Sequence, residues 1–212
     1  MTKRGSDFVY LDVTHKDPGA IRSHFPNIYE KCLSIGIDIT RDWIPVTPAA
    51  HYCCGGVKVD TNGETSIRHL YALGETSCTG LHGANRLASN SLIEAVVYAD
   101  QAARHAASLL PKVDIQEGIP DWDFEGTQHT EEMLMIIQSK REMQTILSNY
   151  VGIVRSNLSL KRAMRRLEIL WQETEELYNK TKPNRELCEL RNMIAVAYLV
   201  IKQGREIKES VG

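Results

Sequence analysis

Several features are missing from this 212-residue sequence, and their absence excludes whole classes of protein. No apolar run approaches the roughly 20 residues that cross a bilayer, and the N-terminal stretch MTKRGSDF has no signal-peptide core. The net charge of −2 gives too little excess of either sign for binding to nucleic acid or to a membrane surface. We therefore expect a soluble, cytoplasmic protein that binds its ligands at a local site.

Cysteine pairs at metal-binding or redox spacing are also missing. The five cysteines are scattered and none belongs to a Cys-x-x-Cys pair, which argues against a disulfide framework and a structural zinc site. The adjacent Cys53 and Cys54 stand in HYCCGG between His51 and Gly56. Reactive thiols are one interpretation, but small buried thiols before a glycine turn are the commoner one. We expect neither a metal ion nor thiol catalysis.

The pattern GxGxxG, which binds dinucleotide phosphates, does not occur in the chain. The densest polar, glycine-rich segment is GETSCTGLHGANRLASNSL, residues 74–92, between a predicted strand at 70–73 and a predicted helix that starts at Ser91. Small residues let the backbone approach a ligand, and a helix N-terminus offers free N–H groups. Spacing alone leaves a ligand-binding loop and a structural turn as equal alternatives.

What is present predicts an α+β fold in the first half of the chain. Asp17-Pro18 is a helix start, and one amphipathic helix from there to Gly36 is expected. The sequence around Asp60-Thr-Asn-Gly63 predicts a hairpin between strands at 57–59 and 65–67. In the helix from Ser91, Glu94 completes a capping box, and apolar residues follow at helical spacing: Leu92, Val96, Ala99 and Ala103.

The second half of the chain has a different composition. Residues 113–129 are acidic, contain proline and glycine, and are predicted to be a linker. Three helical segments follow at about 130–150, 157–180 and 184–204, without strand signals. The third carries an apolar stripe with alternating spacings of three and four: Leu187, Leu190, Ile194, Ala197 and Ile201. An antiparallel three-helix bundle is the simplest way to bury such stripes.

Two long motifs carry a family resemblance. TPAAHYCCGGVKVD, residues 47–60, and LYALGETSCTGLHGANRLASNSLIEAVVYA, residues 70–99, resemble the succinate dehydrogenase and fumarate reductase flavoprotein family in order and separation. The resemblance continues in FVYLDVTHK, YVGIVRSNLSLKRAMRRLE and LCELRNMIAVAYLV, so it covers essentially the whole chain. It implies partial domains in this order: capping domain, 1–50; FAD-binding domain, 51–112; linker, 113–129; helical C-terminal domain, 130–212.

The resemblance also implies roles for individual residues. His51 and Arg86 are expected to bind the carboxylates of a four-carbon dicarboxylate, a task that suits the planar guanidinium of arginine. Glu75 is expected at the ribose of FAD, and the backbone of Ser91 and Leu92 at the flavin ring. The alternatives are a structural histidine at His51 and an ordinary salt bridge at Arg86.

No catalytic residue is expected in this chain. The family's glycine-rich dinucleotide segment and its acid–base arginine, which stands upstream, have no match here. The chain therefore resembles the C-terminal portion of a longer flavoenzyme, and the remaining N-terminal portion is an expected partner.

Within the family, TGLHGANR and the short bundle resemble the branch that oxidises L-aspartate to iminoaspartate with FAD. Oxygen or fumarate would accept the electrons, and the product would feed quinolinate and NAD synthesis, with a functional link to quinolinate synthase. L-Aspartate or a related dicarboxylate is the expected ligand, with no nucleic acid and no membrane as partners. The alternatives are a fragment of a fumarate reductase or succinate dehydrogenase flavoprotein, and a non-catalytic helical interaction module.

Overall fold

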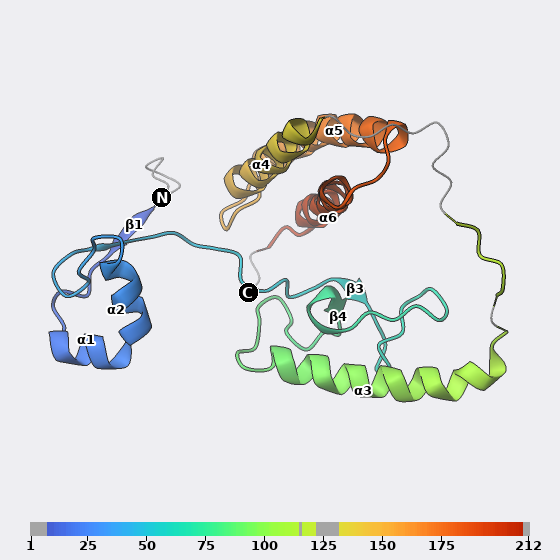
Figure 1. The fold of residues 1–212 in the computed structure, drawn as a ribbon, viewed down its shortest axis with the longest axis horizontal. Helices are drawn as coiled ribbons and strands as arrows, with labels where there is room; N and C mark the ends of the chain where they lie inside the picture. Colours follow the sequence, from blue (N-terminus) through green and yellow to red (C-terminus); the bar gives the residue numbers. More distant parts are fainter. Residues whose placement is uncertain (1–7, 115, 122–131, 210–212) are drawn as a thin grey trace. The chain divides into compact units, whose positions relative to one another are not determined.

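The computed structural model describes residues 8–114, 116–121 and 132–209 (Figure 1). The chain divides into two compact units, the first ending at Ala103 and the second beginning at Arg104, so the division falls inside helix α3 (Ser91–Leu109). Most of the predicted linker's second half, from residue 122 onward, lies outside the described residues. Helices and small sheets occur together, in agreement with the predicted mixed class.

The first unit opens with a two-stranded antiparallel sheet and two short helices. Strand β1 (Val9–Leu11) pairs with β2 (Ile44–Val46), and α1 (Pro18–His24) and α2 (Pro26–Leu33) lie between them in sequence. The predicted start is confirmed, because the Asp17 side chain accepts a hydrogen bond from the Ala20 N–H at 2.7 Å.

The single helix predicted up to Gly36 is wrong. The helix breaks at Phe25 and restarts at Pro26, because proline has no N–H to continue the helical hydrogen bonds but fits a first turn.

The predicted hairpin is only partly present. Asp60 Oδ1 accepts hydrogen bonds from the N–H groups of Asn62 and Glu64, at 2.8 and 3.0 Å, which closes the expected turn. The flanking segments form no ladder beyond one antiparallel bridge between Glu64 and Tyr71, so the predicted strand at 70–73 is reduced to this bridge. Strand β3 (Val57–Lys58) instead pairs in parallel with β4 (Ser77–Cys78), which follows the 3₁₀ helix η1 (Gly74–Thr76).

Helix α3 does not bury the face that its apolar spacing indicates. Leu92, Val96, Ala99 and Ala103 are all exposed, and the buried residues are Glu94 and Ala102. The carboxylate of Glu94 accepts hydrogen bonds from side chains of other segments, so the predicted capping box with Ser91 is wrong. A capping box needs a glutamate whose carboxylate can bond to the N–H group at its own helix start, and here the tertiary contacts of Glu94 occupy that carboxylate.

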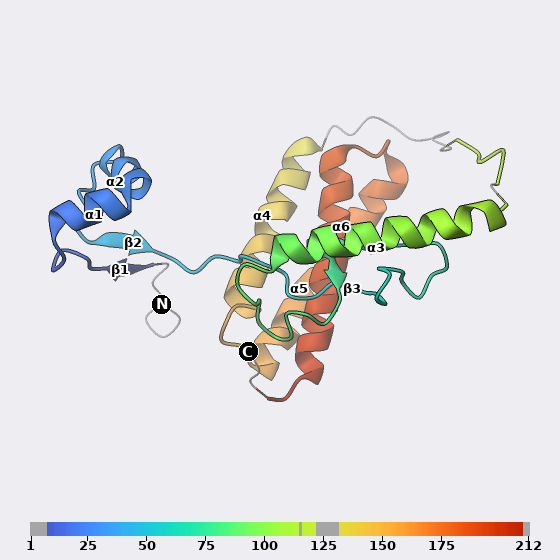
Figure 2. The ribbon, with the colours of Figure 1, turned by 90° about the horizontal axis from the view of Figure 1, so that it is seen from below.

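In the second unit, three long helices pack on one another around a single core (Figure 2). They are α4 (Met133–Tyr150), α5 (Asn157–Lys180) and α6 (Arg185–Glu206). The apolar stripe predicted in the third helical segment is confirmed as the buried face of α6. Most of the core comes from aliphatic side chains: Ile136, Met143, Ile146, Leu160, Ala163, Leu167, Leu170, Leu187, Leu190, Ile194, Ala197 and Ile201.

Side chains cap two of these helices at their first turns. Ser156 accepts from the Ser159 N–H, and Asn184 accepts from the Leu187 N–H at 2.8 Å. In the part of the chain that the structure describes, no helix is both long and apolar enough to cross a membrane.

Candidate functional site

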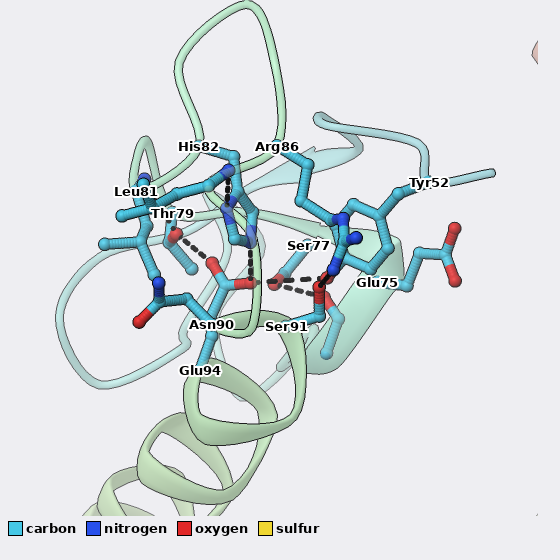
Figure 3. Close-up of polar contacts among 12 residues, drawn as sticks. Tyr52, Glu75, Ser77, Thr79, Leu81, His82, Arg86, Asn90, Ser91 and Glu94 are labelled. Atoms are coloured by element: carbon cyan, nitrogen blue, oxygen red, sulfur yellow. Dashed lines mark hydrogen bonds and ion pairs between the residues drawn. The ribbon is translucent and has the colours of Figure 1, made fainter. Parts of the chain in front are cut away.

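A buried carboxylate organises the glycine-rich region of the first unit (Figure 3). The Glu94 side chain is only 2% exposed and lies on the first turn of α3. It accepts hydrogen bonds from Tyr52 Oη at 3.3 Å, from His82 Nε2 at 2.9 Å and from Thr79 Oγ1. Burying a carboxylate is costly unless donors replace its water, and these three side chains do so.

The hydrogen bonds around His82 define its tautomer. The Leu87 N–H points at His82 Nδ1 across 3.2 Å, so Nδ1 must be the unprotonated nitrogen that accepts. The proton then resides on Nε2, which donates to Glu94. The histidine is therefore a neutral bridge between the α3 carboxylate and the backbone that follows Arg86.

Tyr52 is half-buried and lies next to both His82 and Arg86. Its ring meets the His82 ring edge-on at 5.2 Å and has the Arg86 guanidinium carbon 5.8 Å from its centre. Desolvation, followed by the negative charge of Glu94, raises the pKa of the Tyr52 phenol. The phenol consequently stays protonated at neutral pH and donates to the carboxylate.

Arg86 is half-buried and is held without an acidic partner. Its Nη1 donates to Ser91 Oγ at 3.1 Å, and its guanidinium lies near the Tyr52 ring. No carboxylate forms an ion pair with it among residues 8–114, 116–121 and 132–209. The salt bridge considered as an alternative is thus not found there, and the positive charge is available to a ligand.

Glu75 stands on η1 with one oxygen engaged. Its Oε1 accepts from the Cys53 N–H at 3.0 Å, and its side chain is exposed. Gly56, nearby, has φ +143°, and a Cβ there would lie 2.1 Å from the Thr76 carbonyl oxygen. Gly56 thus lets the loop that follows His51 pass directly against the backbone of η1 and β4.

Two predicted residues lie apart from this network. His51 is exposed, and Leu92 is 82% exposed at the start of α3. Cys53 is exposed too, so the expectation that it is a buried thiol is wrong. Within the described residues, no three His, Cys, Asp or Glu side chains are grouped so that they could hold a metal ion.

Sequence reasoning missed Tyr52 and Thr79 and assigned Glu94 only to a capping box. The one signal available was a single glutamate in the first turn of a helix that is otherwise rich in alanine and valine. Such a glutamate on a helix is usually solvated, so the pattern carries no prediction of burial.

Protein families and curated relatives match this chain in both its N-terminal and its C-terminal parts. The family described as FAD binding domain matches residues 1–92, and the family described as fumarate reductase flavoprotein C-term matches residues 140–212. The L-aspartate oxidase of Pseudomonas aeruginosa is 48% identical over 212 residues, which are 100% of this chain and 39% of that protein. The L-aspartate oxidase of Vibrio cholerae is 44% identical over the same length, 40% of that protein.

Solved structures resemble the fold over nearly the whole chain. A quinol-fumarate reductase with menaquinol molecules superposes with a TM-score of 0.78 at 29% identity, covering 97% of this chain and 38% of that one. Sdh1 of Mycobacterium smegmatis has a TM-score of 0.77 at 26% identity, with 95% and 36% coverage. The chain spans about two fifths of the length of the curated relatives that it matches.

Proposed function

Because this chain belongs to the succinate dehydrogenase and fumarate reductase flavoprotein family, we propose that it is part of an enzyme that oxidises L-aspartate to iminoaspartate. The structural observation that carries the proposal is Arg86, a guanidinium positioned by Ser91 and Tyr52 with no carboxylate of the described chain paired to it. Its planar fork suits a substrate carboxylate. L-Aspartate oxidase relatives at 44–48% identity over the full chain support aspartate as the substrate.

FAD is the proposed cofactor, and the chain's residues fit part of it. The exposed Glu75 keeps Oε2 free for a ribose hydroxyl, and the first N–H groups of α3, at Ser91 and Leu92, have no intrahelical partner. A Cβ at Gly80 or Gly83 would meet open space, so the loop backbone is accessible. FAD, when bound, supplies the hydride acceptor for the Cα–H of aspartate. Oxygen or fumarate is the proposed final electron acceptor.

In this proposal, Arg86 and His51 each face one carboxylate of the substrate. His51 is exposed in the loop that leads into Tyr52, so its ring is accessible for this contact. No acid–base residue is assigned in this chain, and that role is proposed for the N-terminal portion of the whole protein. The functional link to quinolinate synthase and a cytoplasmic location stay predictions.

We also infer that the N-terminal portion packs on α3. Leu92, Ile93, Val96 and Val97 expose a continuous apolar face on this helix, and contiguous apolar surface of this kind usually marks an interface.

The proposed division keeps 1–50 as capping domain, 51–112 as FAD-binding domain and 130–212 as helical domain. Mutual packing of α4, α5 and α6 supports an antiparallel three-helix bundle for the last.

A fumarate reductase or succinate dehydrogenase activity is the second candidate. It is supported by the fold likeness to the quinol-fumarate reductase, although at 29% identity against 48% for the Pseudomonas aeruginosa L-aspartate oxidase. Both reactions bind a four-carbon dicarboxylate, so Arg86 fits either.

The test uses a chimera in which this chain replaces the matched 212 residues of the Pseudomonas aeruginosa relative. We expect the purified chimera to hold FAD and to reduce it with L-aspartate under anaerobic conditions, with slower or no reduction by succinate. Reduction by succinate alone would support the second candidate. A chimera that holds FAD and is reduced by neither compound would contradict both.

A further inference from the structure

We propose that Glu94, acting through His82 and Tyr52, is a positioning residue that holds Arg86 in its substrate-binding orientation. The proposal rests on the proposed function, since it assigns the purpose of Arg86 to a dicarboxylate substrate. It concerns a side chain that is only 2% exposed.

Glu94 joins helix α3 to two other segments, one that contains Tyr52 and one that contains both Thr79 and His82. It is separated from Tyr52 by 42 residues, from Thr79 by 15 and from His82 by 12, and it accepts a hydrogen bond from each (Figure 3). An apolar side chain would fill this position at lower desolvation cost. The presence of a buried carboxylate with three donors therefore indicates a role in orienting groups rather than in filling space.

The direction of every hydrogen bond in the network follows from its neighbours. Thr79 Oγ1 already accepts from the Leu81 N–H at 3.2 Å, so its own proton points to Glu94. His82 Nδ1 accepts from Leu87, so Nε2 donates. With Tyr52 donating as well, the Glu94 carboxylate accepts three hydrogen bonds and donates none.

Two sets of contacts connect the Glu94 carboxylate to Arg86, one through Tyr52 and one through His82. Through Tyr52, the bonded hydroxyl and the edge-on His82 ring fix the aromatic ring beside the guanidinium. Through His82, the bond from the Leu87 N–H fixes the backbone immediately after Arg86. Ser91, which accepts from Arg86, lies one helical turn before Glu94 on α3. The Tyr52 ring, the backbone at Leu87 and the Ser91 hydroxyl therefore position the Arg86 guanidinium, and each of the three is connected to Glu94.

The main variant is Glu94→Gln in the chimera, and the probes are L-aspartate kinetics and succinate binding followed by the flavin absorbance change. An amide places an N–H₂ group where two acceptor positions are needed, so one donor of the network loses its acceptor. We expect KM for aspartate and Kd for succinate to rise on the order of ten-fold, with FAD content per protein unchanged. Glu30→Gln, the same change at an exposed glutamate on α2, is the control and should retain normal values.

Tyr52→Phe is the second variant, for the case that Glu94→Gln does not fold. It removes only the hydroxyl bonded to Glu94 and should raise the same two constants by a smaller factor, about three-fold to ten-fold. A further measurement is the ¹⁵N spectrum of the histidine side chains in the 212-residue chain. The His82 signals are identified by their loss in His82→Asn, and they should show the neutral Nε2–H tautomer. A protonated ring, or a proton on Nδ1, would contradict the network.

The outcomes separate this proposal from the proposed function. If both variants lower thermal stability but leave the succinate Kd of the folded, flavin-loaded protein unchanged, Glu94 is merely structural and the positioning role is wrong. If the unsubstituted chimera binds succinate without oxidising aspartate, the proposed activity fails while the two Kd comparisons still decide the positioning role. If it binds no dicarboxylate at all, the ligand role of Arg86 fails and the positioning role fails with it.

Discussion

Arg86 illustrates how a charged side chain can be prepared for a ligand. Pairing it with a chain carboxylate would neutralise the charge and occupy the fork, whereas a hydroxyl and an aromatic ring orient the guanidinium without doing so. A ligand carboxylate then gains a charge-assisted, bidentate interaction without displacing a carboxylate of the described chain.

Replacing Arg86 should therefore affect substrate more than cofactor. In the chimera, Arg86→Ala is expected to lower kcat/KM for L-aspartate by about 10–150-fold, since a hydrogen bond to a charged group contributes roughly 1.5–3 kcal/mol. Arg86→Lys should recover little, because a point charge does not reproduce the fork. Steady-state kinetics and flavin absorbance are measured on the same samples. A loss of activity that only follows the loss of flavin would return Arg86 to a structural role.

Gly56 and Gly55 form a matched pair for testing the close approach beside η1. A Cβ at Gly56 would lie 2.1 Å from the Thr76 carbonyl oxygen, at a φ of +143°. A Cβ at Gly55 would lie 3.9 Å from its nearest neighbour outside the adjacent residues, the Cys53 carbonyl oxygen. Gly56→Ala should destabilise the first unit by at least roughly 1–3 kcal/mol, and Gly55→Ala should change stability little. Thermal unfolding of the chain measures both. Equal effects of the two changes would contradict the clash.

Tyr52 allows a test at alkaline pH. Its folded-state pKa is raised, first by desolvation and then by Glu94, so the protonated phenol is favoured on folding. This stabilisation is present below the unfolded pKa of about 10 and is lost as pH rises through the folded value. Above pH 10, the unfolding free energy should fall more steeply in the parent chain than in Tyr52→Phe. Parallel pH profiles of urea unfolding would count against the raised pKa.

At the scale of elements, α3 and α6 use similar apolar spacing differently. Helix α6 buries its stripe against α4 and α5, whereas α3 buries Glu94 and Ala102 and leaves Val96 70% exposed. Amphipathic spacing predicts which face of a helix is apolar, but it does not predict which part of the protein packs against that face.

The buried face of α6 gives a quantitative test. Leu187 is 0% exposed and Leu199, on the same helix, is 51% exposed. Leu187→Ala should lower the free energy of unfolding by about 2–5 kcal/mol, because it removes buried methyl groups and leaves a cavity. Leu199→Ala should cost less than about 1 kcal/mol. Urea unfolding followed by circular dichroism compares the two, and similar costs would mean that the α6 core is assigned to the wrong face.

At the scale of the whole molecule, the chain carries only part of the proposed flavin site. Glu75 and the start of α3 are present, but the chain spans about two fifths of its curated relatives and has no GxGxxG pattern. The 212-residue chain alone is therefore expected to hold FAD weakly or not at all, whereas the chimera should retain it. Gel filtration with absorbance at the flavin band measures the ratio. Stoichiometric flavin on the chain alone would show that the described residues suffice.

Local patterns in the sequence were sufficient for several features. The Asp17-Pro18 helix start and the stripe from Leu187 to Ile201 were predictable because caps and helix faces depend on residues three or four positions apart. The motifs around HYCCGG and HGANR also led to the family through their order in the chain, without any three-dimensional information.

Only the tertiary structure decided how the site is held together. The parallel pairing of Val57 with Ser77, the burial of Glu94 and its bond to Tyr52 connect segments that are far apart in sequence. Such contacts follow no period, and they depend on how loops close and which polar groups lose water together. For this reason the sequence placed Arg86 in a ligand-binding loop, whereas the folded chain alone showed that Ser91 and Tyr52 hold its guanidinium.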